Sequence, residues 1–70
     1  MYRFLVVIEK TNTGFSAYSP DLPGCIATGL TREETEKNMH EAIEFHIHGL
    51  LEDHLVVPES SSFAEFMVVA

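Results

Sequence analysis

Residues 19–50 read SPDLPGCIATGLTREETEKNMHEAIEFHIHGL, and this stretch decides the fold. Pro20 and Pro23 stiffen its first part, and Gly24 lets the backbone turn. A short strand is predicted over residues 25–29, because apolar and β-branched residues follow this turn. Thr31 then supplies a helix cap, and Glu34, three residues later, completes the pattern of a capping box. The stretch therefore predicts a turn, a strand and the start of a helix.

The helix is expected to run from Thr31 to about residues 51–53, and its apolar residues follow helical spacing. They form one stripe: Met39, Ala42, Ile43, His46, Ile47 and Leu50. Ala42 lets the helix approach a sheet closely. Charged and polar residues lie mostly away from the stripe: Glu41, Glu44, His48 and Glu52. The sequence thus predicts an amphipathic helix whose apolar stripe packs on one face of a sheet.

Outward from this centre, the sequence predicts three more strands, over residues 2–9, 15–19 and 63–69. Residues 11–14 form the turn of a hairpin, and Pro58 prevents continuation of the helix. The element order is β-β-β-α-β, an α+β fold in which a small antiparallel sheet has one helix on one face. We expect a single domain over residues 1–70, without a DNA-binding domain.

Self-association is predicted from the strands over residues 2–9 and 63–69, which are apolar on both faces. One helix covers only one face of a sheet, so a second face or a strand edge should meet another chain. Seventy residues also bury too little surface for much stability alone. We therefore expect a homodimer or a larger oligomer.

The charge balance limits which classes of molecule the chain can bind. Four basic residues stand against eleven acidic ones, giving a net charge of −7. This opposes direct binding of nucleic acid, whose phosphates need Lys and Arg, and suits a basic protein partner. No apolar run is long enough to span a membrane, and Met1 is followed by strand-like sequence rather than a signal peptide. The cytoplasm is the expected location, with Cys25 reduced.

Candidate reactive residues do not form a convincing catalytic or metal site. The four histidines are His40, His46, His48 and His54. No two of them are three or four residues apart, the spacing that would place metal ligands on one helical face. We expect His46 to be packed with one ring nitrogen bonded, and Cys25 to be a small buried apolar residue. The prediction is a protein without metal, cofactor or enzymatic activity.

The motifs of the chain, taken as a set, resemble those of the HicB-like antitoxin family, and the resemblance covers essentially all seventy residues. The matching stretches are Ser19 to Cys25, Thr28-Gly29, Thr31 with Glu33-Glu34, Glu41-Ala42-Ile43 and Val57-Pro58-Glu59. The residues that define the fold motif are Pro20, Asp21, Leu22, Pro23, Gly24, Cys25, Gly29, Thr31, Glu34 and Ala42.

This resemblance implies a partial, degenerate ribonuclease H-like fold and a role as antitoxin in a type II toxin–antitoxin system. The implied partner is a small basic ribonuclease toxin, HicA-like, that cleaves messenger RNA and whose active site the antitoxin blocks. The −7 charge agrees with such a partner. Four acidic residues of the outer helix are candidates for contacting it: Glu41, Glu44, Glu52 and Asp53.

Two alternatives remain open. The first is a solitary oligomeric module that binds a small ligand or has a regulatory role without a toxin. The second is a metal-dependent nuclease, which would need carboxylates such as Glu9, Asp21 and Glu65 to converge on metal ions. The second ranks last, because the net charge repels an RNA substrate.

Overall fold

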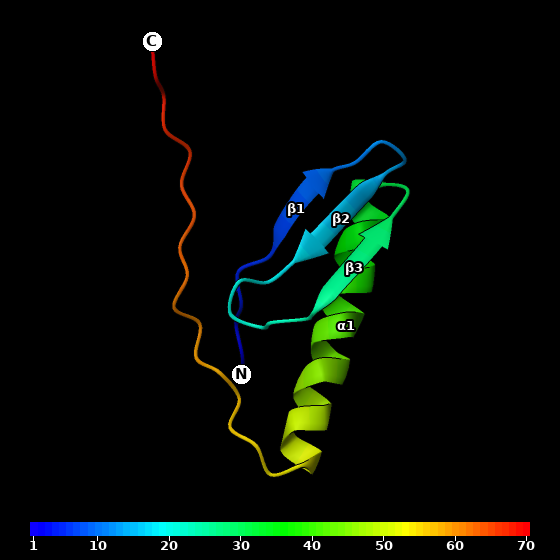
Figure 1. Cartoon of the computed structure of the whole chain (residues 1–70), viewed down its shortest axis with the longest axis vertical. Helices are drawn as coiled ribbons and strands as arrows, with labels where there is room; N and C mark the ends of the chain where they lie inside the picture. Colours follow the sequence, from blue (N-terminus) through cyan, green and yellow to red (C-terminus); the bar gives the residue numbers. More distant parts are fainter.

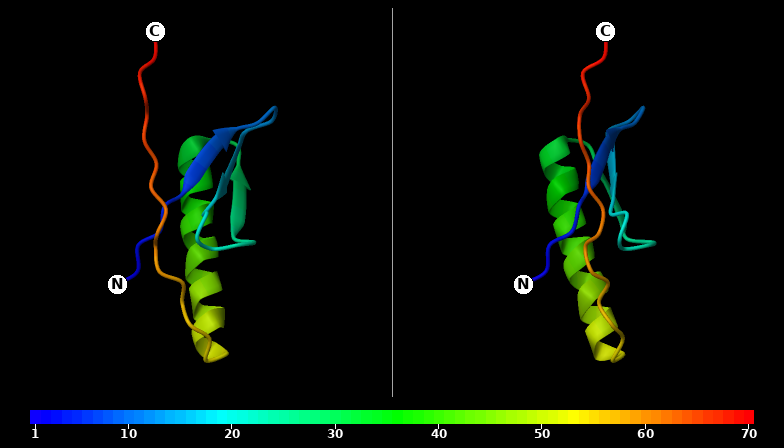
Figure 2. Two further views of the ribbon diagram at one scale, coloured as in Figure 1. Left: turned by 60° about the vertical axis from the view of Figure 1, so that its left-hand side comes forward. Right: turned by 90° about the vertical axis from the view of Figure 1, so that its left-hand side faces the viewer.

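Three antiparallel strands and one long helix form the body of the computed structural model, which describes all seventy residues (Figure 1). The elements are β1 (Val7–Lys10), β2 (Phe15–Tyr18), β3 (Ile26–Gly29) and α1 (Arg32–Glu52). The sheet has the order β1-β2-β3, and α1 lies along one of its faces (Figure 2). The predicted α+β class, with one helix on a small antiparallel sheet, is confirmed.

The hairpin turn between β1 and β2 depends on close backbone packing. The amide of Thr11 donates to the carbonyl of Gly14 at 2.8 Å, and the Thr11 hydroxyl accepts from the Gly14 amide at 3.0 Å. A Cβ atom at Gly14 would lie 2.3 Å from the carbonyl oxygen of Gly29. Only glycine fits there, because that oxygen belongs to the backbone and cannot rotate away.

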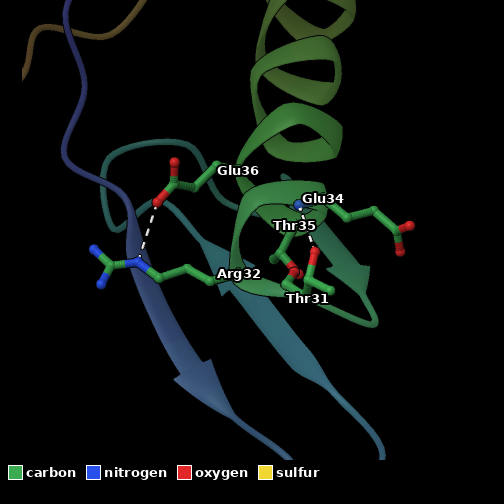
Figure 3. Close-up of polar contacts among 5 residues, drawn as sticks. All are labelled: Thr31, Arg32, Glu34, Thr35 and Glu36. Atoms are coloured by element: carbon green, nitrogen blue, oxygen red, sulfur yellow. Dashed lines mark hydrogen bonds and ion pairs between the residues drawn. The ribbon is translucent and has the colours of Figure 1, made fainter.

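The start of α1 follows the predicted capping pattern, with one difference (Figure 3). The Thr31 hydroxyl accepts from the amide of Glu34 at 3.0 Å, as expected of an N-cap. The Glu34 carboxylate accepts from the amide of Leu30 at 2.8 Å, one residue before the amide that a capping box uses. Both bonds satisfy amides at the helix start, so Thr31 and Glu34 keep their predicted role.

The core lies between the sheet and the predicted apolar stripe of α1. Its fully buried members are Ala17, Leu22, Cys25 and Met39. All six stripe residues are buried or half-buried, so the predicted helix orientation is confirmed. His46 is half-buried as expected, but neither of its ring nitrogens has a hydrogen-bond partner. The predicted bond to one ring nitrogen is thus not made by any group of the chain itself.

The predicted last strand is also wrong for the single chain, which has the order β-β-β-α. Residues 63–69 are extended but belong to no sheet, and their side chains are exposed. Strands exist only as hydrogen-bonded pairs, and no neighbour lies beside this segment. The first strand is likewise shorter than predicted. Val7 pairs with Tyr18, and β2 ends there because Ser19 and Pro20 turn away.

Candidate functional site

The outer face of α1 brings three of the four candidate acidic residues together. At about 100° per residue, Glu41, Glu44 and Glu52 fall within an arc of about 80°, and all three are exposed. Asp53 is rotated by about another 100° and is the C-cap of the helix, where its amide donates to the carbonyl of Gly49 at 3.1 Å. The geometry therefore separates Asp53 from the other three.

The three carboxylates differ in their partners. Glu44 contacts Nδ1 of His40 at 3.2 Å, and Glu52 contacts Nε2 of His48, both one helical turn apart. Glu41 has no ion-pair or hydrogen-bond partner. A basic ligand would thus meet one unpaired carboxylate, Glu41, and two further along the helix that already touch imidazoles.

The outer face of α1 also carries an aromatic side chain that the sequence analysis did not single out. Phe45 is 81% exposed, and it follows Glu41 by one helical turn on the outer face. Gly49, one turn further on, adds no side chain to cover the ring. The available signal was an aromatic residue on the polar side of the helical pattern. Exposed aromatic residues with a charged surround are typical centres of protein interfaces.

The loop between β2 and β3 carries the core residues of the fold motif. Leu22 is only 1% exposed, and Cys25 is also buried. The loop folds as two turns, in which Leu22 donates to the carbonyl of Ser19 and Cys25 to the carbonyl of Leu22. Burial raises the pKa of the Cys25 thiol, which disfavours the thiolate that a nucleophile requires. Cys25 is thus a buried apolar residue, as predicted.

Asp21, in the same loop, holds a segment forty residues away. Its two carboxylate oxygens accept from the amides and hydroxyls of both Ser61 and Ser62, at 3.0–3.2 Å. This four-bond contact, which we call the Asp21 latch, brings the chain beyond α1 back to the sheet (Figure 1). The sequence showed Ser61 and Ser62 only as part of a polar loop, because nothing local pairs them with Asp21.

The latch makes the acid titration of Asp21 measurable. Partial desolvation raises the pKa of this carboxyl, but the bonds from Ser61 and Ser62 outweigh it and hold the pKa below its ordinary value of 3.8. The stabilisation is therefore present above that value and is lost as the pH falls through the lowered pKa. We expect the amide NMR signals of Ser61 and Ser62 to titrate with a midpoint below 3.8.

Asp21→Asn is the control for this titration. It should remove the transition from both serine amides at every pH, while the signals of β2 and β3 stay in place. A midpoint at or above 3.8 in the unaltered chain would show that the serine bonds do not dominate in solution.

Metal chemistry receives no support from the arrangement of side chains. No three residues among His, Cys, Asp and Glu lie close enough together to hold a metal ion. The carboxylate of Asp21 is engaged by the two serines, while Glu9 and Glu65 are exposed on separate segments. Nor does the structure contain a helix with the length and apolar character needed to cross a membrane.

Comparisons with known proteins agree on one family. Residues 4–69 match the family model of the HicB-like antitoxin of bacterial toxin–antitoxin systems. An uncharacterised 14.9 kDa protein of Haemophilus phage HP1 is 42% identical over 62 residues, which are 89% of this chain and 47% of the phage protein. The chain thus spans about half of that relative's length. A UPF0150 protein of Synechocystis is 40% identical over 60 residues, covering 84% of this chain and 76% of that protein.

A solved structure of a toxin–antitoxin complex also contains a chain with this fold. One chain of the HicA3 and HicB3 toxin–antitoxin complex superposes on this chain with a TM-score of 0.68 and 32% sequence identity. The match covers 84% of this chain and 72% of that one.

Proposed function

The chain belongs to the HicB-like antitoxin family, and on that premise we propose that it is the antitoxin of a type II toxin–antitoxin system. Its partner in this proposal is a small basic HicA-like ribonuclease, whose active site it blocks in the cytoplasm without catalysing any reaction itself. The observation that carries the proposal is the match to a chain of a HicA3 and HicB3 complex over 84% of this chain.

The proposed contact surface is the outer face of α1. A ribonuclease must present cationic side chains where it binds RNA phosphates. Glu41, Glu44 and Glu52 offer carboxylates to such a surface, and the net charge of −7 would speed encounter with it. Phe45 supplies an apolar centre within these charges. Asp53, the C-cap, is turned away from these three carboxylates and would meet only a partner that also reaches the end of the helix.

The proposal includes self-association, because β1 lies at a sheet edge and apolar side chains of residues 63–69 are exposed. This part does not depend on the toxin. An oligomer would present more than one copy of the α1 outer face.

Affinity capture of the chain from its own cells at low salt tests the proposed function. We expect native mass spectrometry to show a small basic protein bound in fixed ratio. Once separated, that protein should cleave messenger RNA, and an equimolar amount of this chain should stop the cleavage. The double variant Glu41→Lys/Glu44→Lys should capture less of it, and the binding that remains should depend less steeply on salt.

The outcomes separate the function from the surface. A partner that binds the double variant as tightly as the unaltered chain would remove these two carboxylates from the interface. Recovery of the chain alone, or only with copies of itself, would contradict the antitoxin proposal and favour a solitary module.

A further inference from the structure

A groove between α1 and residues 2–8, which lead into β1, remains open in the single chain. It encloses about 850 Å³. Its eight hydrophobic lining residues include Phe4, Val6, Ile8, Met39, Ile43 and Ile47. The groove exists because α1 packs mainly against β3 and β2 and reaches β1 least. One helix thus covers only part of the sheet, and apolar surface beside β1 is left without a partner.

The same region carries an unpaired sheet edge. β1 pairs only with β2, so the backbone groups on its other side have no strand beside them. Proteins usually protect such an edge with proline, a bulge, charged side chains or a very short strand. β1 is only four residues long and ends in Glu9 and Lys10, but the apolar run that leads into it, up to Val7 and Ile8, has no proline or charge and can accept another strand.

A segment suited to this edge extends from the body of the same chain. We call residues 63–69 the tail. Its large apolar side chains are exposed, and it stands apart from β1 along its whole length (Figure 1). The radius of gyration is 13.6 Å, whereas a compact chain of this length has about 11 Å. The tail is therefore an extended apolar segment that its own body does not bury.

We propose that the tail of one copy adds as a strand to the edge of β1 in a second copy and fills the groove there, in a reciprocal exchange. This extends the self-association proposed above and is independent of the toxin. A second copy is the occupant for two reasons. The Asp21 latch fixes the start of the tail at Ser61 and Ser62, from where it passes its own groove without entering. The tail is also apolar on both faces, as in strands that are covered on both sides.

Charge and alternation along the strands agree with this pairing. Phe4, Val6 and Ile8 pack against the core, and the exposed Arg3, one residue before Phe4, is among the residues that line the groove. In the tail, Phe66 and Val68 alternate with Glu65, its one charged residue. When Phe66 and Val68 enter the groove, Glu65 points out of it toward solvent, where the exposed Arg3 of the groove can pair with it. Arg3 has no ion-pair partner, whereas Arg32 and Glu44, also beside the groove, are already paired with Glu36 and His40.

The oligomeric state of the purified chain, without any other protein, tests the exchange. We expect light scattering after size-exclusion chromatography to give twice the monomer mass of 7.9 kDa at micromolar concentration. Phe66→Asp should give the monomer mass. The matched control is Val56→Asp, which alters another exposed apolar residue outside the tail and should leave the dimer intact. A monomeric unaltered chain, or a dimeric Phe66→Asp variant, would overturn the inference.

Paired cysteines distinguish exchange between copies from folding of the tail onto its own chain. An Arg3→Cys chain mixed with a Glu65→Cys chain should form a disulfide between them on mild oxidation, located by peptide mapping. The buried Cys25 stays in place in both. If one chain carrying both substitutions instead forms the bond internally at the monomer mass, the tail occupies its own groove and the exchange is refuted. Neither result bears on toxin capture, so the two proposals can fail separately.

Discussion

Leu22→Ala is expected to lower the free energy of unfolding by about 2–5 kcal/mol, the range for removing a large apolar side chain from a packed core. Leu22 is 1% exposed and contacts the core of Ala17, Cys25 and Met39. A domain of this length has a total stability of roughly 3.5–10 kcal/mol. The loss is therefore a large part of the total, and thermal or urea unfolding followed by circular dichroism will measure it.

Leu30→Ala is the matched control, because it removes the same atoms from a side chain that is 74% exposed. Its expected effect is within about 0.5 kcal/mol, as for most surface substitutions. The pair also tests the role of the loop between β2 and β3. Equal losses in the two variants would mean that Leu22 does not anchor this loop in the core.

The features that sequence predicted well are those set by local chemistry. Thr31 determines the helix start through its own hydroxyl, and Pro20 ends β2 because it has no amide to donate. The apolar stripe followed from helical spacing alone. Each of these depends on residues within a few positions, so an isolated stretch of sequence contains the information.

The features that sequence missed depend on distant parts of the chain. The Asp21 latch joins residues forty positions apart, and no local pattern marks Ser61 and Ser62 as its donors. In the tail, the sequence predicted the local conformation but not its partner. Its composition correctly indicated an extended segment, but a strand also requires a neighbour, and local sequence does not specify where that neighbour lies.

The outer face of α1 also shows that local sequence predicts only part of a surface. Glu41 and Glu44 were found because charge on one helical face can be counted from spacing. Phe45 was overlooked, because an aromatic residue in an amphipathic helix is usually assigned to the core. Only the placement of α1 over β2 and β3 reveals that its ring is exposed.

Phe45→Ala is expected to weaken binding of the proposed toxin partner by about 30-fold or more, since truncating an aromatic centre of an interface typically costs at least about 2 kcal/mol. Because Phe45 is 81% exposed in the free chain, the substitution should leave the thermal unfolding temperature nearly unchanged. The loss should appear mainly in the dissociation rate, as for apolar contacts formed only in the complex. Surface plasmon resonance or calorimetry with the purified toxin measures it.

Two comparisons make this result specific to the outer face of α1. Leu30→Ala removes an exposed apolar side chain at the opposite, N-terminal end of the helix and should bind the toxin like the unaltered chain. Glu41→Lys should act mainly on the association rate and on its salt dependence, because it changes charge rather than apolar contact. If Phe45→Ala binds normally while Glu41→Lys does not, the toxin is held by charge alone and the ring lies outside the contact. If neither variant differs from the unaltered chain, the toxin binds a surface other than the outer face of α1.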